Sequence, residues 1–388
     1  MKRLAIITSH PVQYNAPLFK LLAESKCVQL KVFYTWEQSR QNDKFDPGFG
    51  KRIQWDIPLL DGYDYEFVEN IASDPGTHHY KGIDNPDLIK KITSWQPDTL
   101  LVFGWSFKSH LACLRFFKGK VPIIFRGDST LLDEQGGVKR ILRRIFLKWI
   151  YKHIDHALYV GTNNKNYFLA HGLREAQLHF APHAVDNQRF AVPDPDYSER
   201  ARGLRHQLGI RNDDVVVLFA GKLEPKKDPF LLIEMASRLD SGNFKFLFIG
   251  NGMLEKDLKR AALGNDRILF MDFQNQQQMP VVYRICDLFI LPSKGPGETW
   301  GLAVNEAMAC NRPVLVSDKA GCAIDLVKEG VNGFVFSPSE TGQVAALLAQ
   351  LLHNKPGLAR MGRSSGELIQ SYSFQQVVAA IGSLVAKL

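Results

Sequence analysis

Residues 297–309 read GETWGLAVNEAMA, a stretch with two glutamates, Glu298 and Glu306, eight positions apart. From Thr299 onward the apolar residues have helical spacing, while the preceding KGPG (294–297) favours a turn. We therefore expect a helix that begins near Thr299, with this residue as its N-cap. The unpaired amides and partial positive charge at such a helix start suit a phosphate or diphosphate.

The two glutamates have a spacing that fits a sugar nucleotide. At 1.5 Å per helical residue they would lie about 12 Å apart along the axis. A diphosphate with a sugar at each end spans a comparable length, and carboxylates accept hydrogen bonds well from vicinal hydroxyl groups. One carboxylate is expected to meet the transferred sugar and the other the ribose. The alternative is that both glutamates flank a surface helix.

A second stretch points to the same kind of ligand. Residues 215–220, VVVLFA, predict a buried strand, and GKLEPKKDP (221–229) follows before an apolar-periodic helix. Ligands bind at the carboxyl ends of strands in open α/β sheets, and ammonium groups there can neutralise a leaving diphosphate. Lys222 and Lys227 are the candidates for this contact. The alternative is a solvated turn.

Together these stretches resemble the retaining glycosyltransferases of family 4, also called group 1. Glu298 and Glu306 match the family's E-x7-E motif, and residues 221–227 match its G-R-L-x-x-x-K element. RPVLVSD (312–318) and EGVNGF (329–334) are similar to its closing strands. The resemblance is strongest from residue 215 to residue 336.

Two positions depart from the family pattern. Lys222 replaces an arginine, so the charge is kept while the bidentate phosphate contact is lost. Asn311 stands where the family commonly has glycine, at a position expected to need a positive φ, and asparagine tolerates that conformation better than most residues.

The resemblance implies an α/β protein with the GT-B fold, in which two Rossmann-like domains face each other across a cleft and the C-terminal helix returns to the first. The length of 388 residues also favours more than one domain, and strands alternate with helices in both halves. Further strands are expected at 4–9, 28–34, 99–103, 122–126 and 157–160. We place an acceptor-binding domain at 1–191, a nucleotide-sugar-binding domain at 192–372 and the returning helix at 373–388.

The resemblance also implies a reaction: transfer of a hexosyl unit from a nucleoside-diphosphate sugar with retention at the anomeric carbon. Glu298 would orient the transferred sugar, as nucleophile or as electrostatic support, and Glu306 the ribose. No cofactor is expected, and no metal, since no D-x-D cluster follows a predicted strand. The diphosphate charge would instead be stabilised by a set of basic side chains and helix-start amides: Lys222, Lys227, Thr299, Trp300, Gly301 and Leu302.

The first domain offers candidates after two of its strands. His10 and Gln13, in the loop SHPVQYNAP (9–17), are expected to contact acceptor or hexose, although His10 could equally cap a helix. In FRGDS (125–129), relatives carry His-Asp, and this chain has Gly127 at the histidine position. We assign Asp128 to catalysis and Arg126 to hexose contact. The alternative for Arg126 is an ion pair with a carboxylate.

The net charge of +8 and the isoelectric point near 9.1 have a local source. VKRILRRIFLKWIYK (138–152) predicts a helix with an apolar face and a basic face, which can lie on an anionic membrane. The alternative is a core helix with a solvated basic face. No apolar run has the length to span a membrane. The basic residues assigned to the membrane-facing side are Lys139, Arg140, Arg143, Arg144 and Lys148.

Cysteine usage and the N-terminus indicate the compartment. The five cysteines have no C-x-x-C spacing, which favours free thiols in a reducing, cytoplasmic setting. A strand expected at residue 4 leaves no room for a signal peptide.

These features favour a peripheral enzyme on the inner face of the cytoplasmic membrane. It would glycosylate a glycan or lipid-linked acceptor in bacterial-type envelope polysaccharide or lipopolysaccharide synthesis. One alternative is a transferase with a soluble small-molecule acceptor. Another is a sugar-nucleotide epimerase, against which the E-x7-E motif argues. A third is a basic polyanion-binding protein, although we expect no nucleic-acid partner, since only the basic helix supports one.

Overall fold

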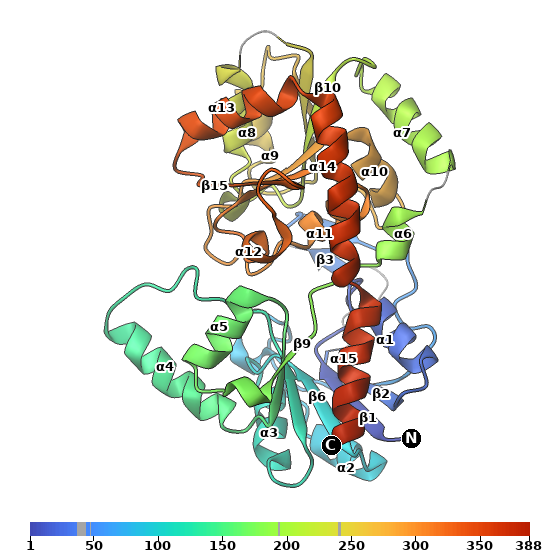
Figure 1. The fold of residues 1–388 in the computed structure, drawn as a ribbon. Coiled ribbons are helices and arrows are strands. Elements are labelled where there is room, and N and C mark those ends of the chain that lie inside the picture. Colours follow the sequence, from blue (N-terminus) through green and yellow to red (C-terminus); the bar gives the residue numbers. More distant parts are fainter. Residues whose placement is uncertain (37–43, 47, 193–194, 240–241) are drawn as a thin grey trace. The chain divides into compact units, whose positions relative to one another are not determined.

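The computed structural model describes residues 1–36, 44–46, 48–192, 195–239 and 242–388. These residues form two compact units (Figure 1). Unit 1 comprises Met1–Lys44, Ile57–His183 and Phe374–Leu388, and unit 2 comprises Phe45–Asp56 and Ala184–Ser373. The chain thus leaves unit 1 after His183, ahead of the boundary expected at residue 192, and residues 45–56 lie in unit 2 although they precede it in sequence.

Unit 1 is built on a seven-stranded parallel sheet of order β5-β2-β1-β6-β7-β8-β9. Each strand predicted for the first domain is present, with ends shifted by at most one residue. The strands are β1 (Arg3–Thr8), β2 (Gln29–Tyr34), β5 (Asp64–Phe67), β6 (Thr99–Phe103), β7 (Ile123–Arg126), β8 (His156–Tyr159) and β9 (Leu178–Phe180).

Helices cover this sheet, and the last of them is the C-terminal helix. It packs against the first helix of the chain and against β9, so the predicted return to unit 1 is confirmed. Its buried residues recur at helical spacing, as expected for one apolar face against a core. The helices of unit 1 are α1 (Ala16–Glu24), α2 (Leu88–Trp95), α3 (Lys108–Phe117), α4 (Val138–Tyr151), α5 (Thr162–Ala170), α15 (Phe374–Lys387) and the short η2 (Tyr80–Gly82) and η3 (Glu175–Gln177).

Unit 2 has a six-stranded parallel sheet of order β12-β11-β10-β13-β14-β15. Its central strand β10 is the predicted VVVLFA strand, and all its residues are buried, because helices cover both faces of a parallel sheet. The strands are β10 (Val215–Ala220), β11 (Phe244–Ile249), β12 (Ile268–Met271), β13 (Leu288–Leu291), β14 (Val314–Ser317) and β15 (Gly333–Phe336); β3 (Lys44–Asp46) and β4 (Lys51–Ile53) form a separate small sheet.

The helices at residues 230–238, 255–261, 341–352 and 355–368 bury apolar side chains against this sheet in one core. Asn311, directly after α11, has a φ of 57°, so the positive φ predicted there is confirmed. The helices are α6 (Asn187–Ala191), α7 (Pro195–Gln207), α8 (Phe230–Arg238), α9 (Glu255–Ala261), α10 (Met279–Ile285), α11 (Leu302–Ala309), α12 (Ala323–Leu326), α13 (Thr341–Leu352), α14 (Lys355–Leu368) and the short η4 (Pro225–Lys227) and η5 (Ile369–Ser371).

The five cysteines are free thiols, as expected; Cys27 is exposed and the others are buried. Burial raises the pKa of Cys286 and of Cys310 to about 12, so these two thiols stay protonated and unreactive at neutral pH. In the described part of the chain, no helix combines the length and apolar character needed to cross a membrane.

Candidate active site

The helix of the two glutamates begins later than the sequence predicts. Helix α11 starts at Leu302, and its N-cap is Gly301 in a left-handed conformation (φ 106°, ψ 62°), so the expectation of a Thr299 N-cap is wrong. The backbone carbonyls of Glu298 and Trp300 accept hydrogen bonds from the amides of Gly321 and Cys322, at 3.0 and 3.1 Å. These contacts hold residues 298–300 outside the helix.

Glu298 therefore lies in the loop that leads into α11, and the axial spacing calculated for two helical glutamates does not apply. Its side chain is only 7% exposed. One carboxylate oxygen, Oε2, lies 2.5 Å from Nζ of Lys227 and accepts a hydrogen bond from Oγ of Ser293 at 3.1 Å. A buried carboxylate needs such partners, because desolvation of an unpaired charge is costly.

This contact unites two residues that the sequence predicts for the donor site. Lys227 follows β10, while Ser293 and Glu298 follow β13. Since β10 and β13 are parallel neighbours, their carboxyl ends meet at one edge of the sheet. Glycine is required close by, because a Cβ atom at Gly250 would lie 2.1 Å from the carbonyl oxygen of Gly221. The turns after the central strands are therefore packed backbone to backbone.

Lys222, the other predicted lysine, has a partner that sequence reasoning missed. Its Nζ lies 2.9 Å from Oδ1 of Asp46, and the same ammonium lies over the Phe49 ring, 5.1 Å from the centroid. Burial alone would raise the pKa of Asp46, but Lys222 and the amides of Phe49 and Gly48 outweigh it, so the pKa is lowered. The carboxylate is thus ionised at neutral pH.

Glu306 projects from α11 into the interior of unit 2 and is 3% exposed. Its Oε2 accepts a hydrogen bond from the Tyr283 hydroxyl of α10 at 2.8 Å. Trp300, in the same predicted donor set, is also buried and donates from Nε1 to Oδ1 of Asn305 at 2.8 Å. Thr299, Gly301 and Leu302 form the remainder of the loop and the helix start.

In unit 1, Asp128 follows β7 and lies beside a histidine that sequence reasoning missed. Oδ2 of Asp128 is 3.6 Å from Nε2 of His183, which follows β9. Burial lowers the pKa of His183, while the hydrogen bond and charge of Asp128 oppose this, so the imidazole is neutral at neutral pH. The sequence feature that could have indicated this residue is the position of His183 just after a strand of unit 1.

Arg126 is buried, and its guanidinium bonds to backbone carbonyls where the alternative supposed a carboxylate. Its Nη1 and Nη2 donate to the backbone carbonyls of Ala181 and Pro182, at 2.8 and 3.0 Å. Burial lowers the pKa of Arg126 to about 10, against the opposing charge of Asp128. The guanidinium therefore ties β7 to the segment that carries His183, and the expected hexose contact stays a prediction.

A cavity of about 200 Å³ lies beside Asp128 in unit 1. Gly127 borders this cavity. A Cβ atom at this position would lie 3.1 Å from the Phe125 ring, so there is little room for a larger residue. His10 is not part of the lining; it contacts Oγ of Ser9 at 3.0 Å and the edge of Trp36, and Gln13 is likewise absent from the lining. The lining residues are Gly104, Trp105, Ser106, Phe125, Gly127, Asp128, Ser129, Tyr151 and Phe168.

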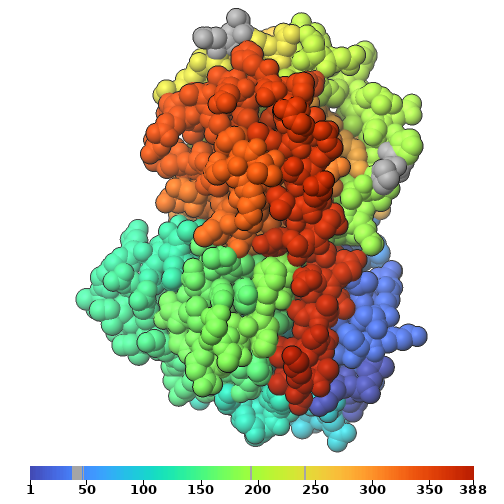
Figure 2. Space-filling model, in the orientation of Figure 1, coloured from blue at the N-terminus to red at the C-terminus, as the bar shows by residue number. Residues whose placement is uncertain are grey.

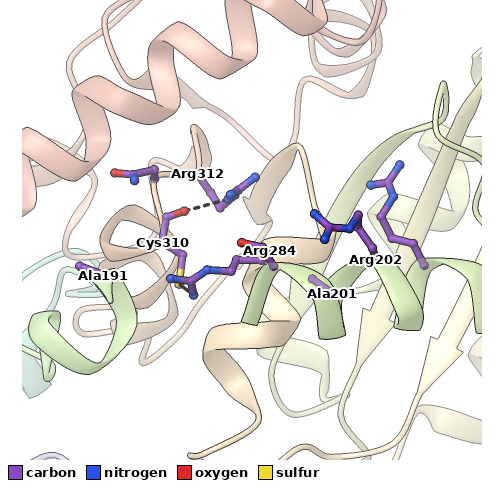
Figure 3. Close-up of a pocket in the computed structure, with 9 residues that line it drawn as sticks. Ala191, Ala201, Arg202, Arg284, Cys310 and Arg312 are labelled. Atoms are coloured by element: carbon purple, nitrogen blue, oxygen red, sulfur yellow. Dashed lines mark hydrogen bonds between the residues drawn. The ribbon is translucent and has the colours of Figure 1, made fainter. Parts of the chain in front are cut away.

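A larger cavity in unit 2, of about 400 Å³, contains none of the predicted site residues (Figure 3). Two of its arginines donate hydrogen bonds to backbone carbonyls. Nη1 of Arg312 donates to the carbonyl of Cys286 at 2.8 Å, and Nη1 of Arg284 donates to the carbonyl of Pro280 at 2.7 Å. Since Arg312 precedes β14, this cavity lies at the amino end of the sheet, opposite the turns that carry Lys227 and Glu298.

Comparison with known proteins identifies related sequences. Residues 202–367 match the family model described as "Glycosyl transferases group 1". The D-inositol 3-phosphate glycosyltransferase of Nocardia farcinica is 30% identical over 327 residues, which cover 76% of this chain and 70% of that protein. The enzyme of the same name from Mycolicibacterium smegmatis is 30% identical over 221 residues, and there the chain spans only about half the length of the relative (49%).

Solved structures share the fold at lower identity. Anabaena Alr3699/HepE, solved in complex with UDP and glucose, superposes with a TM-score of 0.74 at 18% identity, over 100% of both chains. The lipopolysaccharide outer core galactosyltransferase WaaB superposes with a TM-score of 0.69 at 16% identity, again over 100% of both chains. With the two parallel sheets, these likenesses establish the GT-B fold.

Proposed function

The chain belongs to the group 1 glycosyltransferases, and from this premise we propose that it transfers a hexosyl unit from a nucleoside-diphosphate sugar, with retention at the anomeric carbon and without a metal ion. The observation that carries the proposal is the buried contact between Lys227 and Glu298 at the carboxyl ends of β10 and β13. A lysine and a carboxylate at this edge match the two halves of the donor, the diphosphate and the sugar.

The donor would separate this ion pair when it binds. Its diphosphate is a stronger anionic partner for Lys227 than Glu298 is. Lys222 and the amides at the start of α11 also stabilise the negative charge of the diphosphate. Glu298 is then released toward the hydroxyls of the transferred sugar. As the glycosidic bond breaks, the cations stabilise the charge that grows on the leaving diphosphate, and Glu298 stabilises the positive charge on the anomeric carbon.

Glu306 would hold the ribose. Its hydrogen bond to Tyr283 orients the carboxylate, and carboxylates accept hydrogen bonds well from the vicinal hydroxyls of a ribose. Because HepE was solved with UDP, a UDP-sugar is the first donor to test for this chain.

Reaction products test the proposal directly. The purified protein is incubated with UDP-, GDP- and ADP-hexoses, and release of nucleoside diphosphate is measured together with the anomeric configuration of the product by NMR. Release from one donor with the α configuration kept supports the proposal. Inversion at the anomeric carbon, or release that requires a divalent cation, contradicts it.

The acceptor would bind in unit 1 beside Asp128. The cavity there has aromatic walls, which suit a sugar face, and its one charged lining residue is Asp128. A carboxylate repels a phosphorylated acceptor, so the cavity favours a neutral glycan end. Because the relatives are named D-inositol 3-phosphate glycosyltransferases, a soluble inositol phosphate is the second candidate acceptor.

Helix α4 supports a membrane-bound acceptor. Its inner face is buried at Leu147, Ile150 and Tyr151. Its first turns instead expose large apolar side chains next to the basic ones, and α4 stands at the outer edge of unit 1 (Figure 2). The exposed apolar residues are Val138, Ile141, Leu142, Ile145 and Phe146, with exposed fractions from 45% to 71%. The alternative of a core helix with a solvated basic face accounts for the buried inner face but not for the exposed apolar side chains, and we propose that this exposed face rests on the anionic inner surface of the cytoplasmic membrane.

Charge reversal on α4 is expected to abolish vesicle binding. Each basic residue near an anionic surface contributes about 1 kcal/mol, so Lys139→Glu, Arg140→Glu and Arg143→Glu together are expected to weaken binding by more than about 100-fold. Sedimentation with vesicles containing phosphatidylglycerol measures this. The matched control reverses three exposed basic residues elsewhere, Lys256, Arg360 and Arg363. Equal loss in the control would show that net charge alone attracts the protein.

Release of Lys222 from Asp46 is expected to tighten nucleotide binding. A partly exposed ion pair contributes about 0.5–1 kcal/mol, so Asp46→Asn is expected to lower the Kd for the preferred nucleoside diphosphate about two- to fivefold. Calorimetric titration measures the change. Asp56→Asn is the control, because Asp56 accepts from the Gln277 amide instead of a lysine. Unchanged affinity in Asp46→Asn would mean that Lys222 does not contact the ligand.

A further inference from the structure

A compact cluster of metal-ligating groups lies in the loop between β5 and α2 of unit 1. Nε2 of His78 is 3.1 Å from Oδ2 of Asp74, and Nε2 of His79 is 3.3 Å from the same oxygen. One ligand atom from each residue lies within 4.8 Å of the others. We propose that Asp74, His78 and His79 bind a divalent transition-metal ion, with Zn²⁺ as the best fit, at a site separate from the transfer reaction.

Two of the three separations between the ligand atoms fit tetrahedral zinc. Zinc bonds of about 2.0–2.1 Å place neighbouring ligand atoms about 3.3 Å apart around a tetrahedron. The two separations between imidazole nitrogen and carboxylate oxygen have this value within 0.2 Å, and the two imidazole nitrogens lie within 4.8 Å of each other. Three protein ligands leave the fourth position for water, and the exposure of Asp74 and His78 gives a metal ion access from solvent.

The loop is held in this shape by contacts that do not involve a metal. A Cβ atom at Gly76 would lie 2.5 Å from Nδ1 of His78, so glycine lets the imidazole fold back toward Asp74. The Gly76 amide donates to the carbonyl of Gly82 at 3.0 Å. Asn70 closes the base of the loop, since its Oδ1 accepts from the amide of Asp84 at 2.8 Å and its Nδ2 donates to Gly82 at 2.9 Å. A loop held in this way loses little entropy when it binds.

The ligand types select the ion. Two imidazole nitrogens with one carboxylate oxygen suit zinc, nickel or copper, whereas magnesium and calcium prefer oxygen ligands alone. An alternative use of the same atoms is hydrogen bonding to Asp74, from Nε2 of His78 to the carboxylate at 3.1 Å and from Nε2 of His79 to the backbone carbonyl at 3.0 Å. Because these hydrogen bonds are exposed, they add little stability to the protein. They therefore do not explain why the loop places Gly76 directly against the His78 ring.

Zinc binding to the full chain tests the proposal. After treatment with EDTA, the protein is titrated calorimetrically with Zn²⁺, and with Mg²⁺ as the oxygen-preferring comparison. We expect Zn²⁺ to bind and to raise the thermal midpoint, and Mg²⁺ to do neither at this site. The double variant His78→Ala/His79→Ala is expected to weaken zinc binding by at least about tenfold. Replacement of the exposed His206 and His353 by alanine is the matched control and leaves binding unchanged.

A third variant tests the geometry without removing a ligand. Gly76→Ala keeps all three ligands but forces His78 away from Asp74, so it is expected to weaken zinc binding while nucleotide-dependent activity stays as in the wild type. Zinc binding that survives in the double variant, or an unaltered affinity in Gly76→Ala, overturns the proposal. Neither result bears on the glycosyl transfer, which uses other residues.

Discussion

Replacement of Glu298 by glutamine is expected to lower turnover by about 100- to 1,000-fold without weakening nucleoside diphosphate binding. Glutamine keeps the size of the side chain and a hydrogen-bonding oxygen, so the packing beside Ser293 is retained. It lacks the negative charge that stabilises the anomeric centre as the bond to the diphosphate breaks. The loss should therefore appear in kcat and not in the binding of the nucleotide.

The measurement is steady-state release of nucleoside diphosphate, with calorimetry for affinity. Glu367→Gln, an exposed change on α14, is the matched control. Because Glu298 is buried against Lys227, the thermal midpoint of each variant must be recorded, so that a folding defect is not mistaken for a chemical one. Full turnover in Glu298→Gln would remove this residue from the mechanism.

Replacement of Lys227 by alanine is expected to weaken nucleoside diphosphate binding by about 10- to 100-fold, since a hydrogen bond to a charged group contributes about 1.5–3 kcal/mol. It should also destabilise the free protein by about 3 kcal/mol, because Glu298 is left buried without its cation. The neighbouring Lys226 is the matched control, as it pairs with Glu224 on the same turn and not with Glu298.

A double variant separates these two effects. Lys227→Ala/Glu298→Gln removes both charges, so stability should recover toward the wild type while nucleotide binding stays weak. Recovery of binding together with stability would show that Lys227 acts through folding and not through contact with the diphosphate. Chemical denaturation and calorimetry on the same preparations give both quantities.

Local sequence was sufficient for the strands and for the residues that follow them. The central strand β10 was recognisable because a parallel strand covered on both faces is a continuous apolar run. Lys227 could be assigned to the donor edge because it lies in the turn that follows that strand. The positive φ of Asn311 was likewise predictable, since few residue types other than glycine and asparagine adopt this conformation after a helix.

Contacts between distant parts of the chain could not be predicted. Asp46 reaches Lys222 only because residues 45–56 pack in unit 2, and no local pattern reveals that. The same holds for His183 beside Asp128. The start of α11 was misplaced because the amides of Gly321 and Cys322 compete for the carbonyls of residues 298 and 300, an effect that helix propensity does not include.

Unit 2 is proposed to hold a nucleoside diphosphate between Lys227, Glu298 and Glu306. Thermal unfolding of the wild type, Glu306→Ala and Tyr283→Phe is measured with UDP, GDP, ADP and CMP. A ligand at 100 times its Kd stabilises the folded state by about 2.7 kcal/mol. Tyr283→Phe removes the hydroxyl that contacts Glu306 and keeps the carboxylate.

We predict that one nucleoside diphosphate raises the midpoint of the wild type and of Tyr283→Phe, and that Glu306→Ala shows little or no shift. No shift with any nucleotide, or the same shift in Glu306→Ala as in the wild type, would contradict the assignment of the donor site.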